Sequence, residues 1–492
     1  MTLVHRVLYP QPITDLDDYR ERGGGEGLEA ARKVEPAALI QELEASGLRG
    51  RGGAGFPTGT KWRTVAEHAS PVLPTTVVVN GAEGEPGTFK DRTILRNDPY
   101  QVVEGALIAA RAVGASNIIF GLKKSFGEEV ARLRGAIDEI IAAGWADVVE
   151  LEVFEGPNEY LYGEETALLE TLDGRYPFPR LAPPFRRGVT EVVDTAAEAS
   201  SGSGLSAPVE MAGPGGDVVA PPTLVDNVET LANVPRIIAR GADWFRTHGT
   251  QESPGTIVCT VTGSTQRHGV GEVPMGTPLR EVIETIGGGA QAGRRIKAVL
   301  PGVAQGFIPE NLLDTPLSYE DMAAIGSGLG SAGFIVFDDS DDMAAVAAGV
   351  SRFLAVESCG QCTPCKHDGL HLADLMKRVC QSDAGDHDLS TIQKRVDTVA
   401  DGARCYLAQQ HQNVLNSLLE LYGDEVQAHV GGAAEPVEPE LIAELVDISD
   451  GVATWDERHR EKQPDWSYDE VDSGQVPAER YGEHRAPQGL EE

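Results

Sequence analysis

The sequence predicts an α/β protein in which a helical, cysteine-bearing domain follows a larger alternation of strands and helices. Two observations support this prediction: strand and helix patterns alternate from residue 35 to about 245, and helical periodicity dominates from about 343 to 422. Of the 492 residues, 41% are hydrophobic, which is enough apolar material for more than one core. We therefore expect five segments: an N-terminal arm (1–34), an α/β domain (35–245), a small α+β module (246–335), a helical domain (336–430) and an acidic tail (431–492).

The first segments differ sharply in pattern. Residues 1–34 end in the glycine-rich stretch 23–27, which indicates an extended or loosely attached arm. From residue 35 the apolar spacing of Ala38, Leu39 and Leu43 is typical of a helix, and Gly47 is placed to end it.

The α/β domain is predicted from a strand that runs into a polar loop. The β-branched run 75–79 is typical of a buried strand, and the polar loop 80–92 follows it directly. Helical patterns at 102–113 and 128–143 flank a strand pattern at 117–122, which predicts a Rossmann-like α/β sandwich. Ligands of such sheets bind at the carboxyl ends of strands, where the polar loop lies.

The rest of the chain changes character twice. A strand pattern at 256–262, a helical pattern at 279–286 and another strand pattern at 296–300 predict the small α+β module. After residue 431 the chain becomes acidic and contains prolines, so we expect a mostly disordered tail.

Charge and composition exclude several classes of partner. The formal net charge of -35 disfavours nucleic acid and anionic membrane surfaces. No run approaches the roughly eighteen consecutive apolar residues of a spanning helix, and the first residues lack the apolar region of a signal peptide. We therefore expect a cytoplasmic protein without direct membrane insertion.

The cysteine spacing predicts an iron–sulfur site. Three thiols occur at x2, x2 spacing and a distant fourth can complete a cubane, so the predicted ligands of a [4Fe-4S] cluster are Cys359, Cys362, Cys365 and Cys405. Tetrahedral zinc is the rival interpretation, although zinc sites usually pair two C-x2-C knuckles. Cys380 is a possible alternative ligand, but we expect Cys259 and Cys380 to be core residues.

Residues 47–59 form a stretch too rich in glycine for the interior of a helix or strand. Without Cβ atoms, such a loop lets backbone N–H groups approach a phosphate. Arg51 and Lys61 place cations beside it, which favours an anion-binding loop over a plain linker.

Several separate motifs resemble the NuoF-type FMN- and NADH-binding subunit of respiratory complex I. They are residues 50–59 with Lys61-Trp62, residues 83–92 (Glu-Gly-Glu-Pro-Gly-Thr-Phe-Lys-Asp-Arg), Gly163-Glu164-Glu165-Thr166-Ala167, Asn227-Val228-Glu229-Thr230, and the cluster loop 357–365. The resemblance spans roughly residues 35 to 425.

The resemblance implies a set of site residues. Glu83, Glu164 and Glu165 would be catalytic, and Phe56 and Glu85 would contact the adenosine side of the dinucleotide. The residues around FMN and the nicotinamide would be Gly50, Arg51, Gly52, Gly53, Lys61, Asn80, Glu83, Tyr160, Gly163, Glu164, Glu165, Val225 and Asn227.

The resemblance also implies a fold and an activity. The middle module would be an SLBB-like β-grasp fold and the cysteine domain a helical bundle. The protein would oxidise NADH through FMN, pass single electrons to its [4Fe-4S] cluster, and deliver them to a small [2Fe-2S] partner subunit and further iron–sulfur subunits. Such partners would hold it at the inner face of the cell membrane. Two alternatives remain: a diaphorase subunit of an NAD-linked hydrogenase or formate dehydrogenase, and a non-catalytic electron relay that has lost dinucleotide binding.

The chain departs from the family pattern near the proposed pocket. Ala82 stands where an acid is usual, Ala182 where a lysine is usual and Asp226 where an asparagine is usual, while a polar residue near Arg63-Thr64 replaces an aromatic one. These changes keep the relay alternative open.

Without the resemblance, the same residues have simpler interpretations. Glu164 and Glu165 would be the acidic start of a helix, Tyr160 and Phe56 packing residues, and Lys61 a surface cation.

Overall fold

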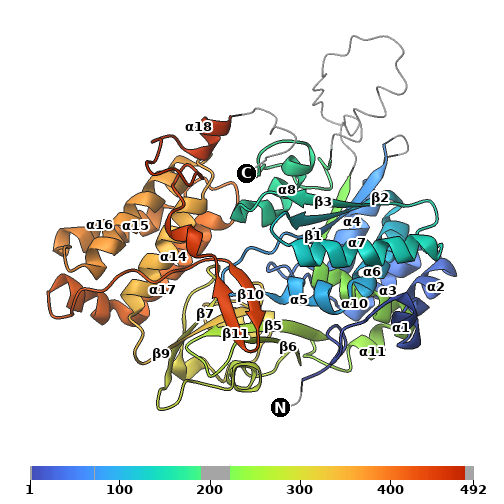
Figure 1. The fold of residues 1–492 in the computed structure, drawn as a ribbon, viewed down its shortest axis with the longest axis horizontal. Helices are drawn as coiled ribbons and strands as arrows, with labels where there is room; N and C mark the ends of the chain where they lie inside the picture. Colours follow the sequence, from blue (N-terminus) through green and yellow to red (C-terminus); the bar gives the residue numbers. More distant parts are fainter. Residues whose placement is uncertain (1–2, 71–72, 190–221, 483–492) are drawn as a thin grey trace, which may run out of the picture.

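A computed structural model describes residues 3–70, 73–189 and 222–482 of the chain. A parallel sheet with its helices, a second sheet and a group of helices lie around a common centre, and the C-terminal hairpin crosses between them (Figure 1).

The first sheet has the strand order β3-β2-β1-β4, with all strands parallel. Its strands are β1 (Thr75–Gly81), β2 (Ala115–Lys123), β3 (Glu150–Gly156) and β4 (Thr223–Asn227). The chain runs from β1 outward to β3 and then returns to the other side of β1. The order therefore reverses between β1 and β4, which is where ligands bind in open α/β sheets.

Helices cover both faces of this sheet. Successive side chains of β1 point to opposite faces, so alternate residues of this strand contribute to two different cores. Val77 and Val79 join one core with residues of α6, whereas Val78 joins a second core with Leu168 and Leu169 of α8. The helices of this part are α3 (Pro36–Ser46), α4 (Thr58–Glu67), α5 (Lys90–Asn97), α6 (Pro99–Val113), α7 (Gly127–Ala142), η1 (Tyr160–Gly163), α8 (Glu165–Leu172), α10 (Val228–Arg240) and α11 (Ala242–Phe245). The predicted strand at 75–79 and helices at 102–113 and 128–143 are confirmed as β1, α6 and α7.

The prediction of a loose N-terminal arm is wrong for residues 3–34. They form α1 (Leu16–Glu21) and α2 (Glu26–Arg32), and buried Glu104 accepts hydrogen bonds from Tyr19 Oη, Gly25 N and Leu28 N at 2.7 to 2.8 Å. A Cβ on Gly27 would lie 2.4 Å from Pro235 O. The glycines here permit close packing rather than flexibility.

The second sheet has the order β6-β5-β9-β7-β8 and mixes parallel and antiparallel pairs. Its strands are β5 (Thr256–Gly263), β6 (Gly269–Pro274), β7 (Ile296–Pro301), β8 (Ile308–Pro309) and β9 (Gly333–Asp338), with α12 (Leu279–Val282), η2 (Ile283–Gly287), η3 (Glu310–Leu312) and α13 (Tyr319–Ala324). The predicted α+β character of this region is confirmed.

The helical part contains the cysteine cluster. It consists of α14 (Met343–Glu357), the π-helical turn η4 (Pro364–Asp368), α15 (Gly369–Cys380), α16 (Asp386–Thr398) and α17 (Leu407–Val430), which kinks at Tyr422. In the described ranges, no helix combines the length and apolarity needed to cross a membrane.

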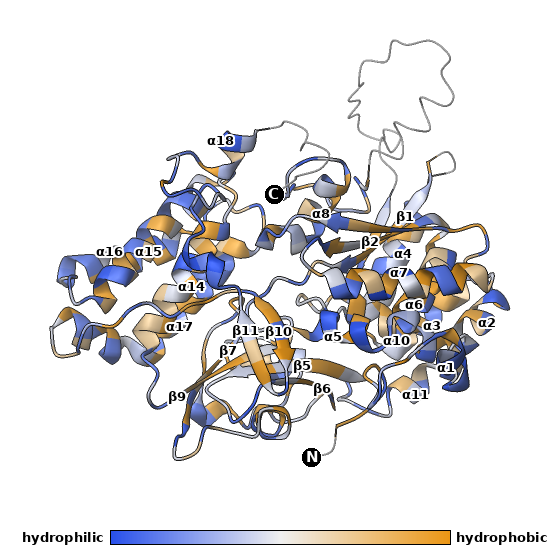
Figure 2. Ribbon diagram, in the orientation of Figure 1, coloured by the Kyte–Doolittle hydropathy of each residue, from blue (hydrophilic) through white to orange (hydrophobic). Residues whose placement is uncertain are grey.

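The predicted disorder after residue 431 is wrong for residues 431–482, while residues 483–492 lie outside the described ones. The segment forms β10 (Leu445–Ser449), β11 (Val452–Trp455), η5 (Glu457–Arg460) and α18 (Pro477–Tyr481). Figure 2 shows β10 coloured as hydrophobic, and Leu445 and Ala453 form a small core with Phe89. Its acids pair with cations of the first part, as Glu444 does with Lys123 at 2.6 Å. A few apolar anchors and specific ion pairs thus order a segment whose composition suggests disorder.

Candidate functional site

A cavity of about 760 Å³ opens at the carboxyl ends of β1 and β4. This volume is in the range of cofactor and ligand sites. Of the residues predicted to bind FMN or the dinucleotide, those lining the cavity are Gly50, Gly52, Gly53, Phe56, Lys61, Asn80, Glu83, Glu85, Tyr160, Gly163, Glu164, Glu165, Val225 and Asn227. Arg51 is the exception.

Strand register brings the two asparagines together. Asn80 and Asn227 are direct partners in the β1–β4 ladder, although they are far apart in sequence. Asn80 Nδ2 donates to Gly163 O at 2.9 Å, and Asn227 Oδ1 accepts from Glu229 N at 3.0 Å as the N-cap of α10. Both side chains are therefore held by backbone groups at the cavity wall.

The glycine-rich loop forms another part of the wall and needs its glycines. Gly53 and Gly55 have φ of +126° and +63°, conformations that other residues rarely adopt. A Cβ on Gly52 would lie 3.1 Å from Asn227 Cβ, and one on Gly55 would lie 2.3 Å from the Tyr319 ring. The backbone can therefore approach a bound group closely, which fits the phosphate end of FMN.

The cations beside this loop are already engaged. Arg51 is buried, and its guanidinium donates to the carbonyl oxygens of Thr256 and Pro254 at 3.2 and 3.1 Å. Arg51 was predicted to offer its charge to a phosphate, but in the structure its guanidinium binds backbone carbonyls and does not line the cavity. Lys61 does line the cavity, with Nζ 2.6 Å from Glu165 Oε1 and 2.6 Å from Val225 O.

The predicted catalytic acids differ in their surroundings. Glu83 accepts hydrogen bonds from Asp91 N and Arg92 Nε, both at 3.0 Å, so its carboxylate secures the start of α5. Glu164 caps α8 by accepting from Ala167 N at 2.8 Å, as the simpler interpretation expected. Glu165 lies closer to solvent than Glu83, with 36% of its side chain accessible.

Tyr160 and Glu85 meet across the cavity. Tyr160 Oη donates to Glu85 Oε2, and Glu85 Oε1 accepts from Val303 N at 2.7 Å. Burial raises the pKa of Glu85, against the lowering effect of these two hydrogen bonds. Phe56 keeps 53% of its surface exposed at the cavity, which leaves an aromatic face free for a bound ring.

Sequence reasoning missed part of the wall. Asp91, inside the 83–92 motif, lies at the cavity and accepts a hydrogen bond of 2.7 Å from Asn227 Nδ2. Its neighbour Lys90, a basic residue that the sequence did offer for an anionic ligand, donates to Asn227 Oδ1 at 3.1 Å. Residues 327–331 also line it, within a second glycine-rich stretch from 326 to 333 that could have been recognised by its composition.

The predicted cluster ligands come from two places in the helical part. Cys359 and Cys362 follow the end of α14, Cys365 lies in η4, and Cys405 lies two residues before the start of α17. All four line one small cavity, whereas Cys259 and Cys380 are buried elsewhere. Within the described residues, no three His, Cys, Asp or Glu side chains are arranged around a single metal ion. Four thiols around a shared cavity are the donor set that a cubane requires.

Burial sets the protonation of these thiols in the bare protein. It raises the pKa of Cys359 to about 11 and the pKa of Cys405 to about 12. Because a thiolate is the form that binds iron, cluster insertion must release protons from these groups.

The two cavities share a wall. Leu161, Cys405 and Leu407 line both the large cavity and the small one. Electrons leaving a group in the large cavity would therefore have a cluster ligand as an immediate neighbour.

Comparison with known proteins identifies both regions. Residues 43–236 match the family described as the Nuo51 FMN-binding domain, and residues 345–429 match the NADH-ubiquinone oxidoreductase-F iron-sulfur binding region. The predicted FMN and [4Fe-4S] cofactors are confirmed at the level of these two regions.

Relatives with known names cover most of the chain. The NADH-quinone oxidoreductase F 2 subunit of Rhizobium meliloti (strain 1021) is 35% identical over 425 residues, which are 84% of this chain and 94% of that protein. NADP-reducing hydrogenase subunit HndC of Solidesulfovibrio fructosivorans is 36% identical over 426 residues, which are 84% and 80% of the two chains. A crystal structure of NAD+-reducing [NiFe]-hydrogenase in the H2-reduced state matches with a TM-score of 0.72 and 30% identity, covering 87% of this chain and 68% of that chain. The chain belongs to the NuoF family of FMN- and [4Fe-4S]-binding, NADH-oxidising subunits, which work within multi-subunit complexes such as NADH-quinone oxidoreductases and NAD-reducing hydrogenases.

Proposed function

We propose that the large cavity holds FMN and admits NADH, and that electrons then pass singly to a [4Fe-4S] cluster on Cys359, Cys362, Cys365 and Cys405 and onward to a partner subunit. FMN supplies the step that a protein side chain cannot, since it accepts a hydride and releases single electrons. The observation that carries the proposal is the shared wall of Leu161, Cys405 and Leu407 between the two cavities.

The residues at the cavity have distinct proposed roles. The glycine backbone from 50 to 53 holds the phosphate of FMN, and Asn80 and Asn227 orient the ring system from the strand ends. Phe56 and Glu85 contact the adenosine side of the dinucleotide. Glu165 and Lys61 form the polar edge, where an acid disfavours a 2′-phosphate, so we expect NADH to be preferred over NADPH.

The decisive experiment distinguishes an FMN-containing, NADH-oxidising subunit from a relay subunit that holds only the cluster. The full chain is purified without oxygen, its flavin, iron and sulfide contents are measured, and NADH is titrated while the flavin absorbance is followed. Bound FMN bleached by NADH, followed by cluster reduction, supports the proposal. Iron and sulfide with no flavin would instead support the relay alternative, which the alanine at position 82 keeps open.

A diaphorase subunit of an NAD-linked hydrogenase is the second candidate, favoured by the similarity to HndC and to the hydrogenase structure. Co-purification distinguishes the two: a nickel-containing partner indicates a hydrogenase, and membrane subunits indicate a quinone reductase. In both cases we propose a small [2Fe-2S] subunit as the next electron carrier. We also propose a cytoplasmic location at the inner face of the membrane through partner subunits.

The finer description of the fold belongs to the same proposal. We assign residues 35–245 to a Rossmann-like FMN/NADH domain, 246–335 to an SLBB-like β-grasp module and 336–430 to a helical bundle. The strand order of the first sheet and the mixed second sheet support these assignments.

A further inference from the structure

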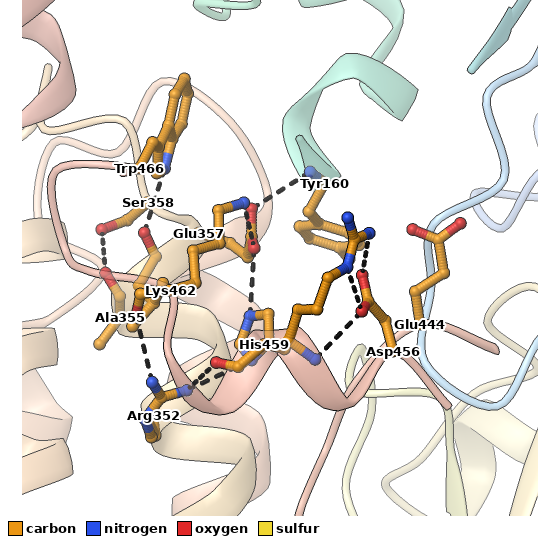
Figure 3. Close-up of polar contacts among 12 residues, drawn as sticks. Tyr160, Arg352, Ala355, Glu357, Ser358, Glu444, Asp456, His459, Lys462 and Trp466 are labelled. Atoms are coloured by element: carbon orange, nitrogen blue, oxygen red, sulfur yellow. Dashed lines mark hydrogen bonds and ion pairs between the residues drawn. The ribbon is translucent and has the colours of Figure 1, made fainter. Parts of the chain in front are cut away.

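Glu357 connects the two cavities from behind the cluster loop. It is the last residue of α14, two positions before Cys359, and only 3% of it is exposed. Its Oε2 accepts a hydrogen bond of 3.2 Å from the backbone N of Tyr160, whose side chain lines the large cavity. One carboxylate thus joins the wall of the flavin cavity to the loop that carries the first cluster ligand (Figure 3).

The charge of this carboxylate is compensated from the C-terminus of the chain. Lys462 Nζ lies 2.7 Å from Glu357 Oε1, and His459 Nε2 lies 3.1 Å from the same oxygen. Both partners are buried, with 6% of each exposed. Figure 3 shows Lys462, His459 and the backbone of Tyr160 gathered around the Glu357 carboxylate.

An aromatic row supports the same connection. The rings of Tyr160 and Phe353 are 5.3 Å apart, and those of Phe353 and His459 are 4.9 Å apart. Packing therefore fixes the side chains at both ends of the Glu357 contacts.

The segment that supplies Lys462 also covers the cluster loop. We call residues 456–482 the C-terminal strap. Ala478 N donates to Cys359 O at 2.9 Å, and a Cβ on Gly360 would lie 2.5 Å from Val476 Cβ. The matched iron-sulfur family region ends at residue 429, so these contacts come from sequence beyond it.

A buried cation ties the strap to the loop a second time. Lys366 Nζ donates to Ser358 O at 2.9 Å and to Pro464 O at 2.6 Å, and Trp466 Nε1 donates to Val356 O at 3.1 Å. The strap is thus built into the wall behind the cluster and is not merely resting on the surface.

We propose that Lys462 and His459 are positioning residues for electron transfer: they hold the Glu357 carboxylate so that it ties the Tyr160 wall of the flavin cavity to the cluster loop. This inference rests on the proposed function of the two cavities. Without its partners, the buried carboxylate would repel an electron added to the cluster and would lose its fixed geometry.

The test compares two substitutions of cations in the strap. Lys462→Met removes the ammonium and keeps an unbranched apolar side chain about as long as the lysine's methylene stem. Arg460→Met is the matched control, because the Arg460 side chain is 57% exposed and pairs with Glu457, which is itself 71% exposed. Each full-length variant is assayed for FMN content, for the midpoint potential of the cluster in a dithionite titration followed by EPR, and for the rate of cluster reduction after rapid mixing with NADH.

We expect Lys462→Met to retain FMN, to move the cluster midpoint potential to a more negative value and to slow NADH-driven cluster reduction at least tenfold. Arg460→Met should match the wild type in all three measurements. His459→Gln, which keeps a neutral hydrogen-bond donor, should shift potential and rate in the same direction by less. If Lys462→Met does not accumulate as folded protein, His459→Gln decides the matter.

The results also separate this inference from the proposed function. A wild-type potential and rate in the folded Lys462→Met or His459→Gln variant overturns the positioning role. Failure of NADH to reduce the wild-type protein, with a cluster still reducible by dithionite, overturns the proposed function instead, and the positioning role is then judged on the dithionite potentials.

Discussion

Replacing Asp226 by asparagine should stabilise the flavin-binding part of the apoprotein at neutral and alkaline pH. Asp226 lies at the end of β4 and is 5% exposed, and its Oδ2 accepts a 2.6 Å hydrogen bond from Trp62 Nε1. Burial raises the pKa of Asp226 to about 6, although Lys61 and the hydrogen bond from Trp62 oppose the rise. An asparagine at this position can still accept the Trp62 hydrogen bond without carrying a charge.

The size of the effect follows from the difference between the folded pKa of about 6 and the ordinary value of 3.8. The folded protein holds this proton more tightly than the unfolded chain does, so ionisation of Asp226 costs folding free energy. At about 1.4 kcal/mol for each pH unit, the cost is about 3 kcal/mol above pH 6. It decreases as the pH falls through 6 and is absent below about 3.8.

Native-state hydrogen exchange of peptides from β4 and α4 measures this free energy locally in the wild type and in Asp226→Asn. The variant should be more stable by up to about 3 kcal/mol at pH 8, and the advantage should fall to near zero at pH 4. A difference that does not change with pH, or a less stable variant at pH 8, would refute the assignment of a raised pKa to this carboxyl.

Three further predictions concern the cofactor sites and the helical part. Cys362→Ser should abolish the normal EPR signal of the reduced cluster and leave the FMN content at the wild-type level, because the thiol lines the small cavity and not the large one. A normal cluster signal in this variant would show that the ligand assignment is wrong. Gly55→Ala should weaken FMN retention after dialysis, measured by flavin fluorescence. The new Cβ would meet the Tyr319 ring, and a positive φ costs a residue with a Cβ on the order of 1–2 kcal/mol. Unchanged retention would argue against the loop as the phosphate-binding site. Burial lowers the pKa of His411 to about 4, so the folded protein resists its protonation and stability is lost as the pH falls from 6.5 through 4, by about 3 kcal/mol in total. His411→Gln should therefore flatten the acid sensitivity of exchange in α17, and a variant as acid-sensitive as the wild type would contradict this prediction.

Local patterns in the sequence were sufficient to predict the central elements and to propose the cluster ligands. The β-branched run that became β1, the periodicity of α3 with Gly47 after it, and the C-x2-C-x2-C loop depend on residues close together in the chain. Such features follow from backbone propensity and spacing, which the sequence expresses directly. The glycine-rich loop was recognised for the same reason.

The partners of side chains depended on the tertiary structure. Nothing in the sequence indicated that the guanidinium of Arg51 would bond to carbonyl oxygens of residues 254 and 256, or that Glu83 would be engaged by α5. Charged residues near a motif can face either a ligand or the protein. Only the packing of the second sheet and of α5 decided between these two directions.

The two ends of the chain show the same division most clearly. Glycines at 23–27 and an acidic composition after 431 predicted loose segments, because composition describes an average tendency to remain solvated. The fold instead offered Glu104 as a partner for the N-terminal helices, and Lys123 and Glu357 as partners for the C-terminal segment. The sequence by itself thus predicted the central elements, the candidate cluster ligands and the family, whereas the tertiary structure decided which charges and termini close around the site, since these contacts join residues 76 to 321 positions apart.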